Sequence, residues 1–443
     1  MNKFIILMKK ELRDILTLQT IIPIVLMVVL LNVMGSFMND MISSISSTDG
    51  EATAKNTVAV IDMDNTDGSK SLVTAINMSG YNIFTPIMTD PTAAYDSHKD
   101  EFDVLIVIPD GFGGTLMGES GKSANIAVYS NVKSFSLMSM VSGSTISAVI
   151  DSVNQTLSDS LLAANLNSDA PDLEFIKNPI ETTEYSRVNG SIEQIPPSVV
   201  SNIVSSQTMF VPIIIWIIVM FSSQTLAGSM TGEKFDKTLE TLLTTPVNRN
   251  FILFAKMLSA SLVSLAYAVV FMFSYDNMIG TMTGGIETAT SMDYTAILEN
   301  LGISFNVGTY AILGISTFLS IIIGLCIAMV IGVLAEDMKK LQSLLMPLII
   351  IMMIPYLVSM FVDINTLPMI ARVLLYIIPF THTFTAIGNV FTSNFVMLII
   401  GLVYQFIFLL VGLGITRNIF ATDKLFTLKL DFSKKKKTPE NQN

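Results

Sequence analysis

The stretch MFVPIIIWIIVMFSSQTL, Met209–Leu226, contains eighteen consecutive residues without a charged side chain. A helix needs about 20 mostly apolar residues to cross the hydrocarbon core of a bilayer. Because a helix makes its backbone hydrogen bonds within its own segment, such a run is stable in lipid. The stretch therefore predicts a transmembrane helix.

Five further runs have the same character, and together they predict a multi-pass α-helical membrane protein. The six predicted transmembrane helices are Leu16–Met38, Met209–Leu226, Phe251–Phe273, Tyr310–Leu334, Leu344–Val362 and Asn394–Ile415. The first run is too long for the apolar core of a signal peptide and lacks an Ala-x-Ala-like cleavage site, so we expect an uncleaved anchor. Lys256 is the charged exception; it lies near the end of a span, from where its amine is expected to reach the interface.

The composition agrees with a membrane protein that carries one polar domain. Of the 443 residues, 51% are hydrophobic and 14% are charged, against about 25% charged residues in a typical soluble domain. Residues 39–205 contain 21 acidic and 7 basic side chains, a net charge of −14 in a chain that carries −11 in total. The remainder is slightly basic, at +3, and this distribution argues against a nucleic-acid partner.

The positions of the basic residues predict the orientation of the spans, because cytoplasmic loops carry an excess of Lys and Arg. Basic residues gather before the first span, in the loops after spans two and four, and after the last span: Lys3, Lys9, Lys10, Arg13, Lys234, Lys237, Arg249, Lys339, Lys340, Arg417, Lys424, Lys429 and Lys434–Lys437. We therefore expect a protein of the cell membrane with both termini in the cytoplasm.

This topology divides the chain into four parts. Residues 1–38 are expected to form an amphipathic helix and the first span, and residues 39–205 an α/β extracytoplasmic domain with a helical stalk, inserted between spans one and two. Residues 206–430 hold spans two to six, and residues 431–443 are a basic cytoplasmic tail.

The α/β prediction rests on short apolar runs that end in turn residues. The predicted strands are Thr57–Ile61, Tyr81–Phe84, Val104–Ile108 and Asn125–Tyr129. Ser69–Asn77 has a helical composition, and residues 136–165 follow helical spacing. Alternating strands and helices are typical of a small α/β domain.

Within this domain, Gly118–Ser123 ends like a phosphate-binding loop. A P-loop requires a glycine five residues before its Gly-Lys-Ser, but that position is Leu116. The stretch therefore predicts a surface turn. The two histidines, His98 and His382, lie far apart with no Cys or carboxylate at ligand spacing. We expect no metal, no cofactor and no catalytic residues.

The fourth span contains small residues at Gly314, Ser316, Gly324 and Gly332. Small side chains let the backbones of two membrane helices approach closely. They predict a tight helix contact, either within one subunit or across a dimer. The cores of the six spans contain no carboxylate, which argues against a transporter with its own acid relay.

The stretch GEKFDKTLETLLTTPVNRNFILFAKML, Gly232–Leu258, connects spans two and three. It predicts a short amphipathic helix over residues 232–245, ended by Pro246. Phe235, Leu239, Leu242 and Leu243 share one face of this helix. Such a helix either rests on lipid headgroups, which composition alone favours, or docks into a cytoplasmic partner.

The same stretch resembles the coupling-helix region of ABC (ATP-binding-cassette) transporter permeases of the second type. Those permeases show Glu-Lys-x-x-Gly/Thr-Thr-Leu-Glu-x-Leu-Leu-x-Thr-Pro-Val-Ser/Asn-Arg, followed by a Gly/Ala-Lys pair that opens the next span. The matching residues are Glu233, Lys234, Thr238, Leu239, Glu240, Leu242, Leu243, Thr245, Pro246, Val247, Asn248, Arg249 and Lys256. Asp236-Lys237 departs from the family's Arg-Gly or Arg-Glu pair, which bears on partner choice more than on fold.

Three other stretches resemble the family in the same order along the chain. Leu7–Leu16, LMKKELRDIL, is similar to its elbow helix on the inner leaflet. Val58–Asn65 and Val104–Phe112 resemble the ectodomain of one large subgroup. Met369–Phe384, interrupted by Pro379, resembles the re-entrant helices before the last span.

The resemblance implies the membrane-spanning permease subunit of an exporter. Such a subunit pairs with a second permease subunit and moves substrate out of the cytoplasm, while a separate ABC ATPase subunit hydrolyses ATP. The elbow helix, the coupling helix and Ala335–Gln342 would form the docking surface. The residues implied for coupling to the ATPase are Glu233, Lys234, Phe235, Thr238, Leu239, Glu240, Leu242, Leu243, Pro246 and Arg249.

Two alternatives stay open at this point. One is a permease of the same kind that exports sodium or another small cation. The other, from a different class, is a membrane-anchored envelope receptor or interaction protein that binds its ligand through residues 39–205.

Overall fold

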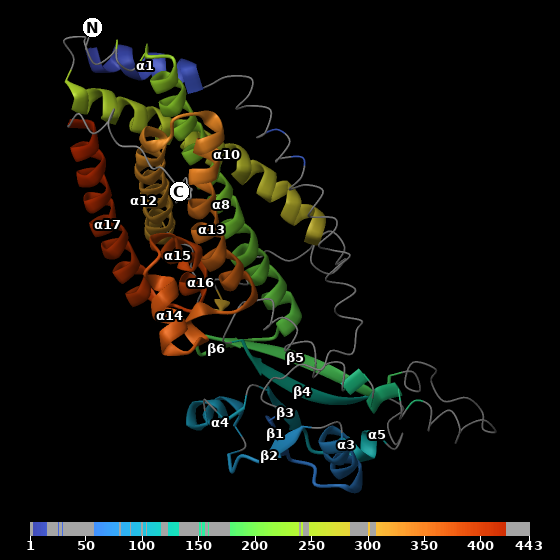
Figure 1. The fold of residues 1–443 in the computed structure, drawn as a ribbon. Helices are drawn as coiled ribbons and strands as arrows, with labels where there is room; N and C mark the ends of the chain where they lie inside the picture. The colour runs from blue at the N-terminus through green and yellow to red at the C-terminus, as the bar shows by residue number, and fades with distance from the viewer. Residues whose placement is uncertain are drawn as a thin grey trace, which may run out of the picture.

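The computed structural model describes residues 3–15, 57–132 with short gaps, parts of 150–158, 178–238, 248–283 and 307–421, and a few single residues between these ranges. Figure 1 shows a bundle of long helices with a β-sheet at one end. A shorter helix, α1 (Lys3–Ile15), lies across the opposite end of the bundle. We call this opposite end the distal end.

Five helices of the described chain are long and apolar enough to cross a membrane. They are α8 (Pro197–Phe235), α10 (Arg249–Thr283), α12 (Val307–Leu334), α13 (Met338–Phe361) and α17 (Phe395–Ala421). They contain the five predicted spans after the first, except for the end residues Val362 and Asn394. The first predicted span, Leu16–Met38, lies outside the described residues except for Val25 and Val29.

Two of the small residues predicted in span four account for the tight contact between α12 and α8. A Cβ atom on Gly324 would lie 2.6 Å from Val219 Cγ1, and one on Gly332 would lie 2.8 Å from the carbonyl oxygen of Ala227. Gly314 has no neighbouring atom within 4 Å of such a Cβ. The contact predicted from small residues is therefore confirmed within the subunit at Gly324 and Gly332.

The chain between α13 and α17 folds back toward the bundle in four short helices. They are η1 (Ile364–Thr366), α14 (Met369–Tyr376), α15 (Pro379–Phe384) and α16 (Ala386–Phe391). Pro379 is the first residue of α15, where a missing N–H costs nothing. Gln405 of α17 holds α15 in place, since its amide nitrogen donates to Thr383 Oγ1 and to the carbonyl oxygen of Pro379.

The sheet has six strands in the order β2-β1-β3-β4-β5-β6. The strands are β1 (Thr57–Asp62), β2 (Asn82–Phe84), β3 (Val104–Ile108), β4 (Ala124–Asn131), β5 (Ile180–Val188) and β6 (Ser191–Glu193). β1 pairs in parallel with β2 and β3, β3 is antiparallel to β4, β4 is parallel to β5, and β5 is antiparallel to β6. The predicted strands are present, and β5 and β6 are additional to them.

Helices cover both faces of the sheet, as expected for an α/β domain. On one face, α3 (Asp67–Met78) and α5 (Phe112–Leu116) enclose a core that includes Ile106 and Ile126. On the other face, α4 (Pro91–Ser97) packs Tyr95 against Leu105. Burial of this apolar area stabilises the domain without any disulfide, at about 25 cal/mol for each Å² removed from water.

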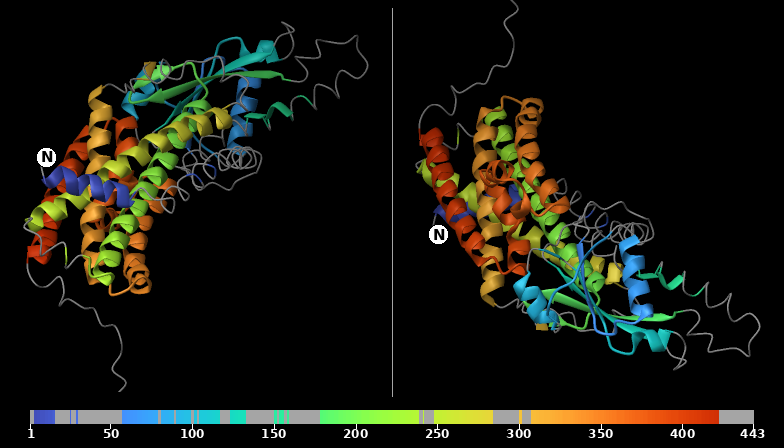
Figure 2. Two further views of the ribbon diagram at one scale, coloured as in Figure 1. Left: turned by 90° about the horizontal axis from the view of Figure 1, so that it is seen from above. Right: turned by 90° about the horizontal axis from the view of Figure 1, so that it is seen from below.

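The sheet joins the bundle through an apolar cluster and two hydrogen bonds. Val188 of β5, Val200 of α8 and Phe391 of α16 are among the buried residues of this cluster. The side-chain amide of Asn189 donates to the carbonyl oxygen of Phe391 at 2.9 Å and to Ser393 Oγ at 3.1 Å. Figure 2 shows that the sheet projects to one side of the bundle from this junction.

Candidate functional site

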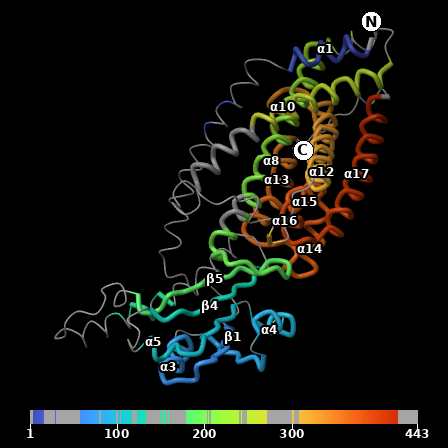
Figure 3. The backbone as a smooth tube through the Cα atoms, turned by 180° about the vertical axis from the view of Figure 1, so that it is seen from behind, coloured from blue at the N-terminus to red at the C-terminus, as the bar shows by residue number. Residues whose placement is uncertain are grey.

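Four segments meet at the distal end of the bundle: α1, the last turns of α8, the first turns of α10, and the turn between α12 and α13 (Figures 1 and 3). They include the elbow helix, the start of the coupling helix and the docking turn that the sequence predicts. The distal end is therefore the candidate site.

A buried lysine joins three of these segments. Lys256 of α10 is 0% exposed, and its Nζ lies 2.8 Å from Glu11 Oε2 of α1 and 2.7 Å from Glu233 Oε1 of α8. Lys10 lies at the rim of this group, with its Nζ 3.6 Å from Glu233 Oε1. We call Lys10, Glu11, Glu233 and Lys256 the ionic cluster.

In the ionic cluster, each buried charge is stabilised by the opposite charges beside it. An ionised group in an apolar interior is strongly unfavourable unless it is paired, and removing one partner of a buried pair costs about 3–5 kcal/mol. Burial acts to lower the pKa of Lys10, but the charges of Glu233, Glu11 and Asp14 outweigh it and the pKa is raised. The charge of Lys10 is thus favoured by the carboxylates beside it.

Apolar contacts reinforce the contact between α1 and α10. Leu7 of α1 packs with Ile252 and Ala255 of α10, and the rings of Phe4 and Phe251 meet edge to face. The hydroxyl of Ser259 donates to the carbonyl oxygen of Met8 at 3.2 Å.

A second lysine joins the end of α8 to the end of α12. Lys234 Nζ donates to the carbonyl oxygen of Val333, in the last turn of α12, and to that of Ala335, the residue directly after the helix. The last carbonyl groups of a helix have no acceptor role within it. A cation at a helix C-terminus also interacts favourably with the helix dipole. Thr231 Oγ1 donates to the carbonyl oxygen of Gly332 at 3.1 Å, one turn before this contact.

The predicted coupling residues therefore fall into three groups. Glu233 and Lys234 point into the subunit. Phe235, at 71% exposure, and Thr238 are exposed, and Arg249 is half-buried at the start of α10. The other predicted coupling residues, Leu239, Glu240, Leu242, Leu243 and Pro246, lie outside the described residues.

The boundary predicted for the coupling helix needs correction. α8 continues through Gly232–Phe235 without a break, so no separate helix begins at Gly232. The chain turns at Asp236-Lys237, where Lys237 has a φ of +57°, and helical backbone resumes at Thr238. The first residues of the predicted helix thus belong to a membrane span.

Lys256 also differs from the sequence-based expectation. It does not reach the interface, because the carboxylates of two other helices enclose it. A lysine within an apolar run is a signal in the sequence that this residue needs a partner. The sequence does not identify that partner, Glu11, which lies 245 positions away.

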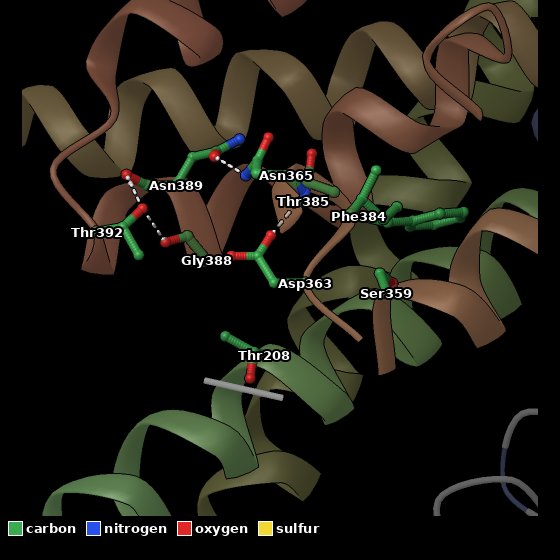
Figure 4. Close-up of a pocket in the computed structure, with 10 residues that line it drawn as sticks. Thr208, Ser359, Asp363, Asn365, Phe384, Thr385, Gly388, Asn389 and Thr392 are labelled. Atoms are coloured by element: carbon green, nitrogen blue, oxygen red, sulfur yellow. Dashed lines mark hydrogen bonds between the residues drawn. The ribbon is translucent and has the colours of Figure 1, made fainter. Parts of the chain in front are cut away.

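A polar pocket lies at the opposite end of the bundle, next to the sheet. It is lined by Thr208, Ser359, Asp363, Ile364, Asn365, Phe384, Thr385, Gly388, Asn389 and Thr392. Figure 4 shows Asp363, Asn365 and Asn389 around it, with the amide of Asn365 donating to Asn389 Oδ1 at 3.0 Å. The pocket offers hydrogen bonds and one carboxylate, and within the described residues no three His, Cys, Asp or Glu side chains gather as a metal site would require.

The stretch that resembles a phosphate-binding loop lies outside the described residues from Gly118 to Lys122. Ser123, directly before β4, donates from its hydroxyl to the carbonyl oxygen of Asn178 at 2.6 Å. This contact ties the last residue of the stretch to the segment that leads into β5.

Comparisons with known proteins extend these observations. A family model described as ABC-2 family transporter protein matches residues 13–416. A crystal structure of a domain assigned to an ABC type-2 transporter from Thermotoga maritima MSB8 is 24% identical, with a TM-score of 0.28, and the match covers 33% of this chain and 97% of that one. Among curated proteins no match is found. Because the family model spans the chain from the end of α1 to the last turns of α17, the protein belongs to the ABC-2 transporter family.

Proposed function

We propose that the chain is the permease subunit of an ABC exporter, and that a separate ATPase subunit docks on its distal end and drives transport. Membership in the ABC-2 family supports a membrane transporter subunit that is not itself catalytic. The direction of transport and the docking site are the parts of the proposal that go beyond the family.

The observation that carries the docking site is the set of contacts at the end of α8. Glu233 and Lys234 are consecutive residues, yet one binds α1 and α10 through Lys256 while the other binds the last carbonyls of α12. The residue that follows, Phe235, is an exposed aromatic side chain. A partner that seats Phe235 and the following turn therefore pushes on three membrane-domain elements at once.

The proposal places the distal end in the cytoplasm and the sheet outside it. The basic residues support this orientation, since Lys9, Lys10, Arg13, Lys339 and Arg417 all lie at the distal end.

The native Cys326 is buried, so single cysteines can be introduced as reporters of this orientation. Met78→Cys should react with a membrane-impermeant maleimide in intact cells, and Phe235→Cys only after permeabilisation. The reverse pattern would overturn the orientation.

The proposal also includes a pair of permease subunits. α13 presents apolar side chains at three- and four-residue spacing that are exposed in the single chain, namely Met346, Ile350, Ile354, Leu357 and Phe361. Such a stripe suits a helix of a second copy or of a related subunit. Native mass spectrometry of the chain purified alone distinguishes these cases, because a homodimer appears without any added subunit.

The docking experiment uses the chain co-expressed with its candidate ATPase subunit. Phe235→Asp, and separately Leu239→Asp with Leu242→Asp, should abolish co-purification and the stimulation of ATP hydrolysis, because a carboxylate cannot enter an apolar pocket without a partner. Met78→Asp is the matched control, since Met78 is 83% exposed on α3 of the sheet domain. Variants that leave both assembly and stimulated hydrolysis intact would show that the docking site is elsewhere.

Transport direction and substrate class need a second assay. In inside-out vesicles an exporter accumulates its substrate when ATP is added. Radioactive sodium and a panel of organic cations, lipids and peptides can be compared in the same vesicles. ATP-dependent loss from the vesicles, rather than accumulation, would contradict export.

A further inference from the structure

The polar pocket next to the sheet is formed by parts of α8, α13 and η1 and by residues 384–392. It encloses about 40 Å³. A single water molecule needs about 10–15 Å³ of such space, so the pocket has room for a chain of about three non-hydrogen atoms. This size suits the end of a small molecule.

Three of the hydroxyl groups that line the pocket offer only lone pairs to a ligand. A hydroxyl carries one proton and two lone pairs. Ser359, Thr385 and Thr392 each donate that proton to a backbone carbonyl oxygen three or four residues earlier, at 2.8, 2.9 and 3.0 Å. A partner of these hydroxyl oxygens must therefore supply the hydrogen, which favours a ligand rich in donors.

Asp363 gives the pocket a negative charge. Its Oδ1 accepts the backbone N–H of Asn365 at 2.9 Å, and Figure 4 shows its second carboxylate oxygen directed toward Gly388. No Lys, Arg or His is among the described residues that line the pocket. Arg372 of the adjoining helix α14 is engaged elsewhere, since it donates to the carbonyl oxygen of Leu367 at 3.0 Å. The carboxylate is therefore available as the counterion of a bound cation.

The other side of the pocket accommodates carbon atoms. Phe384 and Ile364 contribute apolar side chains. A Cβ atom on Gly388 would have one described neighbour within 4 Å, Thr208 Cγ2 at 3.9 Å. Because Gly388 has no side chain, space remains between α16 and α8, and a short hydrocarbon stem fits there.

These features distinguish between classes of ligand. An anion would meet a carboxylate and lone pairs, without a donor from the three hydroxyl groups. Calcium takes about six to eight oxygen ligands, with carboxylates among them, whereas the described lining has one carboxylate. A primary ammonium group carries one positive charge and three N–H donors and has no acceptor, so it matches one carboxylate surrounded by lone pairs. A dehydrated inorganic cation would leave the apolar side of the pocket empty.

We propose that the polar pocket binds the primary ammonium group of a small organic amine, with Asp363 as its counterion and the three hydroxyl oxygens as hydrogen-bond acceptors. The carbon stem of the amine lies between Gly388 and Thr208. The proposal goes beyond the permease function, since binding here depends neither on an ATPase subunit nor on the direction of transport.

The test is saturation-transfer difference NMR of the full-length chain in detergent with propylammonium chloride. Propylammonium has few non-hydrogen atoms, so its dissociation constant should be on the order of 1 mM. The alcohol n-propanol has the same length and no charge, and it should bind about tenfold more weakly or less. Partition of both probes into detergent is measured with the pocket variants and subtracted.

Asp363→Asn tests the counterion. Asparagine keeps an oxygen that accepts the N–H of Asn365, so the unfolding temperature should be unchanged. The affinity for propylammonium should fall about tenfold or more, because a neutral amide replaces the charge. Asp110→Asn removes an exposed carboxylate from the sheet domain and is the matched control, which should bind as the wild type does.

Gly388→Val tests the position of the stem. The added side chain enters the space next to Thr208 and should prevent binding. Gly314→Val is the matched control, since no described atom lies within 4 Å of a Cβ there. Both glycines lie in helices, so the cost of a β-branched residue in a helix applies to both variants.

Four outcomes would overturn the proposal. Equal affinities for propylammonium and n-propanol would show that the pocket does not recognise charge. Wild-type affinity in Asp363→Asn would show that this carboxylate is not the counterion, and equal binding by the two valine variants would place the amine elsewhere. Displacement of propylammonium by sodium chloride, but not by choline chloride at the same ionic strength, would assign the pocket to an inorganic cation.

Discussion

Lys256 is a positive charge that lies entirely within the protein, where α1, α8 and α10 meet. Its removal leaves Glu11 and Glu233 close together, with the exposed Lys10, 3.8 Å and 3.6 Å away, in place of a buried counterion. Lys256→Met should therefore destabilise the membrane domain by about 3–5 kcal/mol, measured as a lower unfolding temperature of the full chain in detergent.

The neutral triple variant sharpens this prediction. Lys256→Met combined with Glu11→Gln and Glu233→Gln removes the charges together, and its unfolding temperature should recover most of the loss. Lys9→Met controls for removing an exposed lysine from α1. A Lys256→Met variant as stable as the Lys9→Met control would show that the ionic cluster does not hold these helices together.

Asp64 is a residue of the sheet domain whose stability contribution depends on pH. The hydroxyl of Thr66 and the backbone N–H groups of Gly113 and Gly111 donate to its carboxylate, and these bonds hold its pKa below the usual 3.8. The contribution is therefore fully present above pH 3.8 and is lost as the pH falls through the lower pKa of the folded state.

Hydrogen exchange can follow this loss at the amides of Gly111 and Gly113. After correction for the intrinsic exchange rate, their protection should fall in acid in the wild type. In Asp64→Asn the pH dependence should disappear, because the amide does not titrate. Protection that stays constant below pH 3.8 in the wild type would contradict the assignment.

At the residue scale, the sequence predicted which residues form the motif better than it predicted where their side chains point. The motif residues Glu233 and Lys234 were assigned to a docking surface, but both side chains turn inward to Lys256 and to the end of α12. Spacing along one chain gives the type of residue at a position. It does not give the distant partners: the carbonyl groups that bind Lys234 lie about 100 residues later, and Glu11, which shares Lys256 with Glu233, lies 245 residues before Lys256 in α1.

Helix α12 lies at the centre of the bundle because its glycines admit α8. A Cβ atom at Gly332 would lie 2.8 Å from a backbone oxygen and 2.9 Å from Met230 Cβ, and neither atom can move without moving α8. Gly332→Ala should therefore cost about 1–3 kcal/mol, as overpacking of a tight contact does. Gly314→Ala, with no atom within 4 Å, should leave the unfolding temperature unchanged. Equal effects of the two variants would contradict this packing.

At the element scale, hydropathy predicted the five long helices that the structure describes, because a bilayer imposes both length and apolar composition on a helix. The family inferred from the Gly232–Leu258 block is confirmed by the family match. The strand Ile180–Val188 was missed because its sequence, IETTEYSRV, is largely polar and lacks an apolar run. It pairs in parallel with β4, a strand far from it in the sequence, so no local sequence pattern reveals this pairing.

The whole molecule depends on how the sheet is held on the bundle. Asn189, with a φ of +51°, makes both side-chain hydrogen bonds of the junction, to Phe391 and Ser393. Asn189→Gly keeps the left-handed backbone accessible and removes these bonds. The sheet should then sample a wider range of positions, although the apolar cluster still holds it.

Electron-electron double resonance measures this range between spin labels at Met78 of α3 and Ile407 of α17. Both sites are exposed. The distance distribution should broaden in Asn189→Gly. The matched control is Asn65→Gly, which makes the same change at a φ of +53° next to β1. An unchanged distribution would show that the apolar cluster alone fixes the sheet.

Helix α8 runs from Pro197, beside the last strand, to Phe235 at the distal end, 39 residues in one piece. At about 1.5 Å per residue it is about 58 Å long, roughly twice the hydrocarbon thickness of a bilayer. The helix therefore links the sheet directly to the distal end, and Pro212 is a position within it where the helical hydrogen-bond pattern is interrupted. If a ligand at the sheet turns this helix and so changes the affinity for an occupant of the distal end, that occupant changes the ligand's affinity by the same factor.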